Sequence, residues 1–277
     1  MNILEQETRQ CKDHQILTFP NKIHPTALVA AGAELGLNVS VGPFSIIGEH
    51  VKIGAGTVIG PHVVIEGWTS IGERNQIGTG TIIGNPPQDL KFRGEESYVL
   101  IGDDNIIREY VTINRGTEGG GLITKIGNNN VIMTSVHVAH DVNIHNNVII
   151  SNGVGLAGHV IVEDWVTLGG LSGIHQFTQI GFMAIVGKMS AISKDIPPFF
   201  LVNGNPAKLY GINIERLRRN KYPIGTRMLL QRAYKILVRS GMKLEDAIKK
   251  VEQELPSNPE IDIILQFIRR SNRGIYR

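Results

Sequence analysis

Residues 126–193 read IGNNNVIMTSVHVAHDVNIHNNVIISNGVGLAGHVIVEDWVTLGGLSGIHQFTQIGFMAIVGKMSAIS, and this stretch decides the fold. An aliphatic residue occupies every sixth position, from Ile126 through Ile132, Val138 and Ile144 to Ile192. A period of six matches neither the 3.6-residue period of a helix nor the simple alternation of a flat strand. Six residues make one side of a prism, and three sides make a coil of about 18 residues in a solenoid. The sequence therefore predicts a parallel β-helix.

The same period begins at Ile23 and is interrupted twice. It runs in register to Ile83, resumes in phase between Ile101 and Ile113, and continues from Ile126 after a second break. The three segments hold 26 hexads, or slightly under nine coils, and at about 4.8 Å per coil the prism would be roughly 40 Å long. Residues 1–22 lack the period and are expected to form an N-terminal tail.

A different pattern follows the last hexad. The segment DIPPFFLVNGNPAK, residues 195–208, is rich in proline, which is expected to prevent further strand pairing. Helices are predicted at 213–220, 224–239, 243–254 and 259–270, with prolines near the start of the second and at the start of the fourth. We therefore expect a β-helix domain over 23–204 and a small α-helical domain over 205–277, which would also cap the last coil.

Composition narrows the class of protein. Cys11 is the single cysteine, which excludes an intrachain disulfide framework and fits a reducing compartment. The chain has no apolar run long enough for a transmembrane segment and no signal-peptide core at its start, so a cytoplasmic location is expected. Residues 211–277 carry 15 basic and 7 acidic side chains, against 13 and 18 in the rest. This basic region could bind nucleic acid, anionic lipid or an acidic protein, or could be a solvated helix face.

Histidines outside the core-facing positions are the main candidates for chemistry. Five of them belong to the long repeat and are expected on the surface or at corners: His137, His140, His145, His159 and His175.

The 18-residue coil places some of these positions above one another. His140, Gly158 and Gln176 should stack on successive coils, as should Asp141 and His159. A histidine facing a position without a side chain has room for a substrate beside a free backbone N–H. It could act there as a general base next to an oxyanion site. Asp141 could orient the imidazole, although neighbouring residues on a strand point apart.

A zinc site is the rival interpretation of these histidines. Zinc needs three or four ligands at about 2.0–2.3 Å, whereas His137 and His140 lie about 10 Å apart along an extended strand. These two residues cannot share a metal without another chain, so no metal is expected.

Two further groups of charged residues could bind a substrate. Asp89 and Lys91 lie in the first insertion, where they could hold a sugar hydroxyl and a phosphate or be solvated loop charges. Arg216, Arg218 and Arg219 could meet phosphates or interact only with the dipole of their own helix.

The repeat, the helical end and a series of spaced motifs together resemble a known family. The motifs are PPQDLKFRG at 86–94, VHVAHD at 136–141, LAGHV at 156–160, IHQF at 174–177, DIPPF at 195–199, GNPAKLYGINIERLRR at 204–219 and SNRGI at 271–275. From about Ile23 to the C-terminus the chain is similar to the UDP-N-acetylglucosamine O-acyltransferases, which start lipid A synthesis in Gram-negative bacteria.

The resemblance implies a left-handed β-helix, a homotrimer with active sites between subunits, no cofactor, and a 3-hydroxyacyl thioester of acyl carrier protein as donor. It implies that His140 is the base that deprotonates the 3-hydroxyl of UDP-N-acetylglucosamine and that the Gly158 amide is the oxyanion donor. Substrate-site positions of the family match Asp89, Lys91, His137, His159, His175 and Gln176, and its nucleotide-binding positions match Asn213, Glu215 and Arg219. The basic C-terminal region would receive the acidic carrier protein rather than nucleic acid.

The chain departs from the family pattern at two positions. Asn220, followed by Lys221, stands where the family often has a second basic residue after the position of Arg219, which puts a phosphate contact in doubt. Lys188 stands where some relatives have glycine at the end of the acyl groove. Its stem is expected to shorten the groove and the acyl chain that it accepts.

Two alternatives remain open at this point. A related N-acyltransferase would use a 3-amino sugar nucleotide, and no residue in the sequence separates that acceptor from the hydroxyl. A β-helix zinc hydratase would require bound metal.

Overall fold

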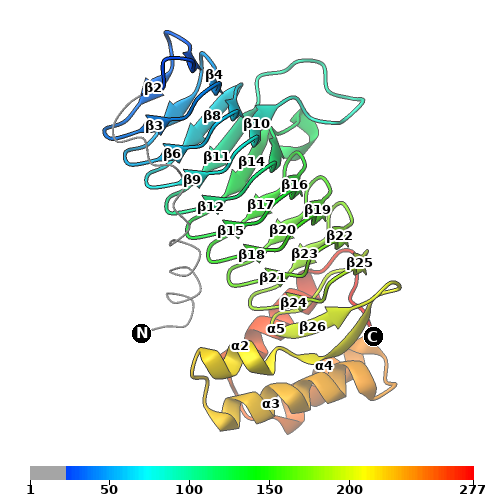
Figure 1. Ribbon diagram of the computed structural model, residues 1–277. Helices are drawn as coiled ribbons and strands as arrows, with labels where there is room; N and C mark the ends of the chain where they lie inside the picture. The colour runs from blue at the N-terminus through cyan, green and yellow to red at the C-terminus, as the bar shows by residue number, and fades with distance from the viewer. Residues whose placement is uncertain (1–22) are drawn as a thin grey trace.

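The computed structural model describes residues 23–277 and contains the predicted parallel β-helix. Its short strands stack into a long prism, and the helices gather at the C-terminal end (Figure 1). The first sheet contains β1 (Leu28–Val29), β4 (Ile46–Ile47), β7 (Val64–Ile65), β10 (Ile82–Asn85), β13 (Thr112–Asn114), β16 (His137–Val138), β19 (Gly155–Leu156), β22 (Gly173–Ile174) and β25 (Ala191–Ile192). The second contains β2 (Glu34–Leu35), β5 (Lys52–Ile53), β8 (Trp68–Ile71), β11 (Tyr98–Ile101), β14 (Ile123–Ile126), β17 (Asn143–Ile144), β20 (Ile161–Val162) and β23 (Gln179–Ile180). The third contains β3 (Ser40–Val41), β6 (Val58–Ile59), β9 (Gln76–Ile77), β12 (Ile106–Ile107), β15 (Val131–Ile132), β18 (Ile149–Ile150), β21 (Thr167–Leu168), β24 (Ile185–Val186), β26 (Phe200–Asn203) and β27 (Lys208–Ile212).

The predicted hexads are confirmed along the whole prism. Within residues 23–277, the first hexad aliphatic, Ile23, forms a bridge to Val41, and the other 25 lie in β1–β25. Each strand pairs in parallel with the strand one coil away, as Ile132 does with Ile150 and Ile150 with Leu168. The side chains of these three residues are fully buried. One continuous column of aliphatic side chains therefore forms the core, and its burial is the main favourable term for the fold.

Sharp corners join the three sheets and limit which residues fit there. A Cβ on Gly54 would lie 2.5 Å from the backbone carbon of Gly72 on the next coil, so a side chain at this corner would collide with backbone. Other corners use the left-handed region with ordinary residues, including Asp141 (φ 60°), His159 (φ 62°) and Phe177 (φ 61°). These three lie one above another at the corner between the first and second sheets. The same backbone geometry therefore recurs there on three successive coils.

Both breaks in the hexad pattern are loops that leave the prism and return in register. The first connects β10 to β11 and protrudes beside the prism (Figure 1). The second connects β13 to β14 and contains a single 3-10 turn, η1 (Glu118–Gly120). Despite both insertions, Ile101 pairs with Ile71 on one side and with Ile126 on the other. The insertions therefore add surface without disturbing the core.

Strand pairing continues past the prolines, so the prediction that they end it is wrong. β26 pairs in parallel with β24, and the chain then reverses so that β27 pairs antiparallel with β26. Pro197 and Pro198 precede β26 and Pro206 lies in the turn between β26 and β27, so their missing N–H groups do not interrupt the ladder. Residues 208–212 are consequently a strand, although the sequence places them in the helical region.

The helices begin at Ile214 and agree closely with their predicted positions. They are α2 (Ile214–Arg219), α3 (Ile224–Tyr234), the π-helical turn η2 (Lys235–Arg239), α4 (Leu244–Glu254) and α5 (Pro259–Arg270). Their apolar faces join the same core, with Leu230, Ile264 and Leu265 at 3% exposure or less. None of the helices within residues 23–277 is both long and apolar enough to span a bilayer.

Candidate active site at a corner of the coils

His140 follows β16 at a corner of one coil, and Gly158 occupies the equivalent corner of the next coil. A Cβ on Gly158 would lie 2.6 Å from Cε1 and 2.7 Å from Nε2 of His140. The imidazole therefore occupies the space that a side chain at position 158 would need. The predicted stacking of His140 on Gly158 is confirmed, and it depends on the absence of a side chain at that position.

Asp141 holds the other edge of the imidazole. Nδ1 of His140 lies 2.8 Å from Oδ2 of Asp141, and a carboxylate can only accept, so the proton is on Nδ1. The lone pair of Nε2 is then available to take a proton. The expectation that the two neighbouring side chains point apart is wrong here, because the left-handed backbone of Asp141 turns its side chain back towards His140.

His159 packs against the same pair. Its Nε2 lies 3.8 Å from Oδ2 of Asp141, and its ring stacks on Phe177 with 4.3 Å between centroids. Burial lowers the pKa of His159, and nearby His140 lowers it further, against the opposing charges of Asp141 and Asp89. His159 is therefore a neutral hydrogen-bonding group at neutral pH.

His137 lies one strand position before the corner, on the outer face of the first sheet. Its Nδ1 forms a 2.7 Å hydrogen bond with Oγ1 of Thr112. Burial lowers the pKa of His137, and the proximity of His140 acts in the same direction. Two of the histidines beside His140 are thus kept neutral by their surroundings.

A groove of about 790 Å³ runs from this corner towards the C-terminal end of the prism. The predicted residues His137, His140, His175 and Gln176 line it together with Gly158.

The floor of the groove is made by outward positions of the first sheet that stack below His137. These are Gly155, Gly173 and Ala191, which pair in register on successive coils. Such small residues leave an open apolar trough three coil steps long, or about 14 Å.

Two residues that sequence reasoning missed also line the groove. Gln88 reaches it from the first insertion, and Tyr276 reaches it from the C-terminus, where its hydroxyl accepts the Ser193 N–H at 2.7 Å. Gln88 lies inside the quoted motif PPQDLK, next to Asp89, so its place in that motif was an available signal. Nothing in the spacing indicates that the C-terminus returns to the last coils.

Asp89 and Lys91 lie on the first insertion, outside the lining of the groove. The backbone N–H of Lys91 donates to Oδ1 of Asp89 at 2.9 Å. The charge of Asp89 raises the pKa of His159, which places the carboxylate near the site. The insertion thus brings Asp89 near enough to act electrostatically on the site.

The residues predicted to bind a nucleotide lie on α2, apart from the groove. Asn213 is 6% exposed and caps α2, since its side chain accepts the Arg216 N–H and its Nδ2 donates to the Met183 carbonyl. Glu215 forms ion pairs with Arg218 at 3.1 Å and with Arg219 at 3.2 Å.

The two positions that depart from the family pattern also lie outside the groove. Asn220 donates from Nδ2 to the Arg216 carbonyl and so caps the end of α2. Lys188 is exposed at the corner between β24 and β25, on the opposite edge of the first sheet from His140.

One cluster of residues has the composition of a metal site. His140, Asp141 and His159 each have one potential metal-ligand atom, and these three atoms lie within 4.8 Å of one another. The spacing of His137 and His140 gives no indication of this group, because the group depends on how the Asp141 side chain turns. In the structure, the Asp141 carboxylate already accepts hydrogen bonds from His140 and Thr117, so protein donors satisfy it.

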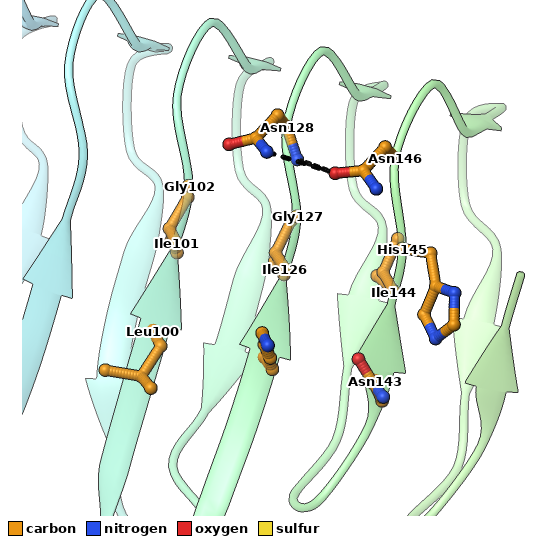
Figure 2. Close-up of a pocket in the computed structure, with 11 residues that line it drawn as sticks. Leu100, Ile101, Gly102, Ile126, Gly127, Asn128, Asn143, Ile144, His145 and Asn146 are labelled. Carbon is orange, nitrogen blue, oxygen red and sulfur yellow. Dashed lines mark hydrogen bonds between the residues drawn. The ribbon is translucent and has the colours of Figure 1, made fainter. Parts of the chain in front are cut away.

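A second hollow of about 500 Å³ lies on the second sheet, over β11, β14 and β17 (Figure 2). Its polar side chains bond to the scaffold, as where Asn146 Oδ1 accepts the Asn128 N–H at 2.8 Å. His145 lies at its edge, 4.0 Å from Asp164. No histidine–carboxylate pair faces a free amide in this hollow, so we do not assign it a catalytic role.

The lowered pKa values of His137 and His159 predict that the fold loses stability on mild acidification. Below the ordinary histidine pKa of 6.5 the unfolded chain binds these protons more readily than the folded chain. Unfolding is therefore favoured as the pH falls through that value, and the full stability is present above it. Urea denaturation at pH 7.5, 6.5 and 5.5 should give decreasing midpoints, and His137→Gln should flatten this trend. A midpoint that rises on acidification would contradict the assignment.

Comparisons with known proteins agree with this arrangement. The family profile described as UDP-N-acetylglucosamine O-acyltransferase, domain 2, matches residues 195–276, and the bacterial transferase hexapeptide repeat matches 32–67, 50–85 and 123–158. The curated acyl-[acyl-carrier-protein]–UDP-N-acetylglucosamine O-acyltransferase of Syntrophobacter fumaroxidans is 47% identical over 92% of this chain and 100% of its own length. That of Thermodesulfovibrio yellowstonii is 49% identical over 93% of this chain and 100% of its own.

Solved structures lead to the same family. LpxA from Acinetobacter baumannii matches with a TM-score of 0.90 and 42% identity over 92% of this chain and 99% of that chain. LpxA from Bacteroides fragilis, described as a UDP-N-acetylglucosamine acyltransferase, has the same TM-score and identity over 92% and 100%. The fold is the left-handed parallel β-helix with a small helical C-terminal part. This chain belongs to the UDP-N-acetylglucosamine O-acyltransferase family.

Proposed function

We propose that this chain transfers a 3-hydroxyacyl group from acyl carrier protein to the 3-hydroxyl of UDP-N-acetylglucosamine, the first step of lipid A synthesis. The observation that carries the proposal is the imidazole of His140 facing Gly158, with Asp141 on its Nδ1, at the head of an apolar groove. This arrangement supplies a base, a free amide and room for an acyl chain in one place.

The reaction follows from these positions. Nε2 of His140 takes the proton of the sugar hydroxyl, whose oxygen attacks the thioester carbonyl and forms the new C–O bond. Asp141 stabilises the imidazolium that results. The C–S bond then breaks, and the sulfur leaves with the proton that His140 returns. Base and acid are thus the same group at successive steps.

Gly158 contributes through its backbone. Its carbonyl accepts the N–H of Phe177, while its own N–H has no acceptor among residues 23–277. A free amide beside the base can stabilise the negative oxygen of the tetrahedral intermediate, an effect that is typically worth about 10²–10³ in kcat for one donor.

The other residues predicted for the site would hold the substrates. We assign His137, His159, His175 and Gln176 to hydrogen bonds with the sugar, since two of these histidines are neutral and can both donate and accept. Asp89 and Lys91 would contact the sugar and a phosphate from the edge of the site.

Helix α2 contacts the corner between the second and third sheets, where Arg216 donates to the Trp165 carbonyl, whereas His140 lies at the corner between the first and second sheets. We therefore propose a homotrimer in which Glu215 and Arg219 of one subunit meet the nucleotide bound at a neighbour, while Asn213 fixes the start of their helix. The basic region 211–277 would receive the acidic carrier protein. This donor also favours a cytoplasmic location.

The test of function is acyl transfer from 3-hydroxyacyl carrier protein to UDP-N-acetylglucosamine, with His140→Ala beside the wild type. Removal of the base should lower kcat about 100-fold or more. His145→Ala, which changes a histidine of another corner, is the matched control and should retain activity. Turnover by His140→Ala equal to that of the wild type would show that His140 is not the base. Transfer only to a 3-amino sugar nucleotide would show that the acceptor group is an amine and not the 3-hydroxyl.

Lys188 is proposed to restrict acyl length, as a long side chain in place of glycine. Because Lys188 lies on the opposite edge of the sheet from His140, its side chain would contact an acyl chain that runs along the interface between two subunits. Lys188→Gly should shift the preferred donor to a longer acyl chain, measured as kcat/KM across carrier proteins loaded with a length series. An unchanged optimum would assign the length limit to residues of the groove itself.

A further inference from the structure

The second insertion, residues 115–122, contacts the carboxylate of Asp141, which orients His140. Thr117 in this loop is 5% exposed. Its backbone N–H donates to Oδ1 of Asp141 at 2.9 Å, and its hydroxyl donates to Oδ2 at 2.6 Å. One residue therefore holds both oxygens of Asp141.

The loop is shaped to make this contact. A Cβ on Gly120 would lie 2.0 Å from Cγ of Asp141, so the turn can rest on the carboxylate only because this position is glycine. The Thr117 carbonyl accepts the N–H groups of Gly120 at 3.0 Å and Leu122 at 2.8 Å, which closes the turn around Thr117. From the other side, Oγ1 of Thr124 accepts the Asp141 N–H at 2.8 Å.

Oδ2 of Asp141 is shared between two donors, the Thr117 hydroxyl and Nδ1 of His140. The position of Oδ2, and with it the geometry of its hydrogen bond from the imidazole, therefore depends on the Thr117 hydroxyl. Such an outer hydrogen bond fixes the tautomer and the ring orientation of a histidine that it does not touch.

On the basis of the proposed acyl transfer, we infer that Thr117 is a positioning residue that acts through Asp141 to keep the proton on Nδ1 of His140 and Nε2 aimed into the groove. The catalytic unit is then Thr117–Asp141–His140. The second insertion serves this unit and is more than a connection between β13 and β14.

The test compares Thr117→Val, which loses the hydroxyl but keeps the shape and the backbone N–H, with Thr117→Ser, which keeps the hydroxyl. Thr117→Val should lower kcat about 10–100-fold and leave the KM of both substrates within about twofold, because no substrate contact is lost. Thr117→Ser should restore most of the rate. Thr81→Val, at a buried threonine whose hydroxyl donates to the backbone carbonyl of Arg108, controls for loss of a structural hydroxyl and should keep the wild-type kcat if it folds.

Wild-type kcat in Thr117→Val would overturn the inference, as would a failure of Thr117→Ser to restore the rate in a folded protein. A second readout does not need activity. In ¹⁵N-histidine NMR spectra, His140, identified by its loss in His140→Ala, should be an Nδ1–H tautomer in the wild type and in Thr117→Ser, and a mixture in Thr117→Val. An unchanged tautomer in Thr117→Val would also overturn the inference. Failure of transfer by the wild type would instead count against the proposed function.

Discussion

The hydrogen-bonded register between coils is the constraint on which this structure depends. Every strand of the prism pairs with the strand one coil away, so the side chains of equivalent positions lie directly over one another. Inside the prism this register stacks aliphatic residues into one column. At the corner between the first and second sheets it stacks His140 on Gly158 and Asp141 near His159. The core and the candidate site are two results of the same geometry.

That geometry also explains why the site is rigid and largely pre-formed. The corner backbone is held by interstrand bonds on both sides, such as the His159 N–H to the His140 carbonyl at 3.1 Å. The left-handed conformation at Asp141 costs free energy in a residue other than glycine. The coils above and below, together with the bonds of Asp141 to Thr117 and Thr124, hold it in place. A base whose partner is fixed in this way needs little reorganisation during reaction.

The repeat made most of the fold predictable, because a six-residue period states which residues face inward and which lie one coil apart. It gave the strands, the continuity across both insertions and the stacking of His140 on Gly158. Features that depend on how the chain leaves the repeat were not accessible. The β26–β27 hairpin carries no hexad signal, the turn of Asp141 follows from its left-handed backbone, and Thr117 and Tyr276 lie on segments whose path no spacing defines. The helix cap at Asn213 was an available signal, since asparagine before a helix is a preferred N-cap.

The substitution Gly158→Ala tests most directly whether the register between coils creates the active site. The backbone of Gly158 lies outside the left-handed region, so alanine is allowed there. The new Cβ, however, would lie 2.6 Å from Cε1 of His140. We expect a kcat for acyl transfer lower by about 100-fold or more in a protein that still folds. Gly225→Ala, where a Cβ meets nothing within 4 Å, should behave as wild type. Normal turnover by Gly158→Ala would contradict the dependence of the site on this register, because the base would then not need the space that the next coil leaves open.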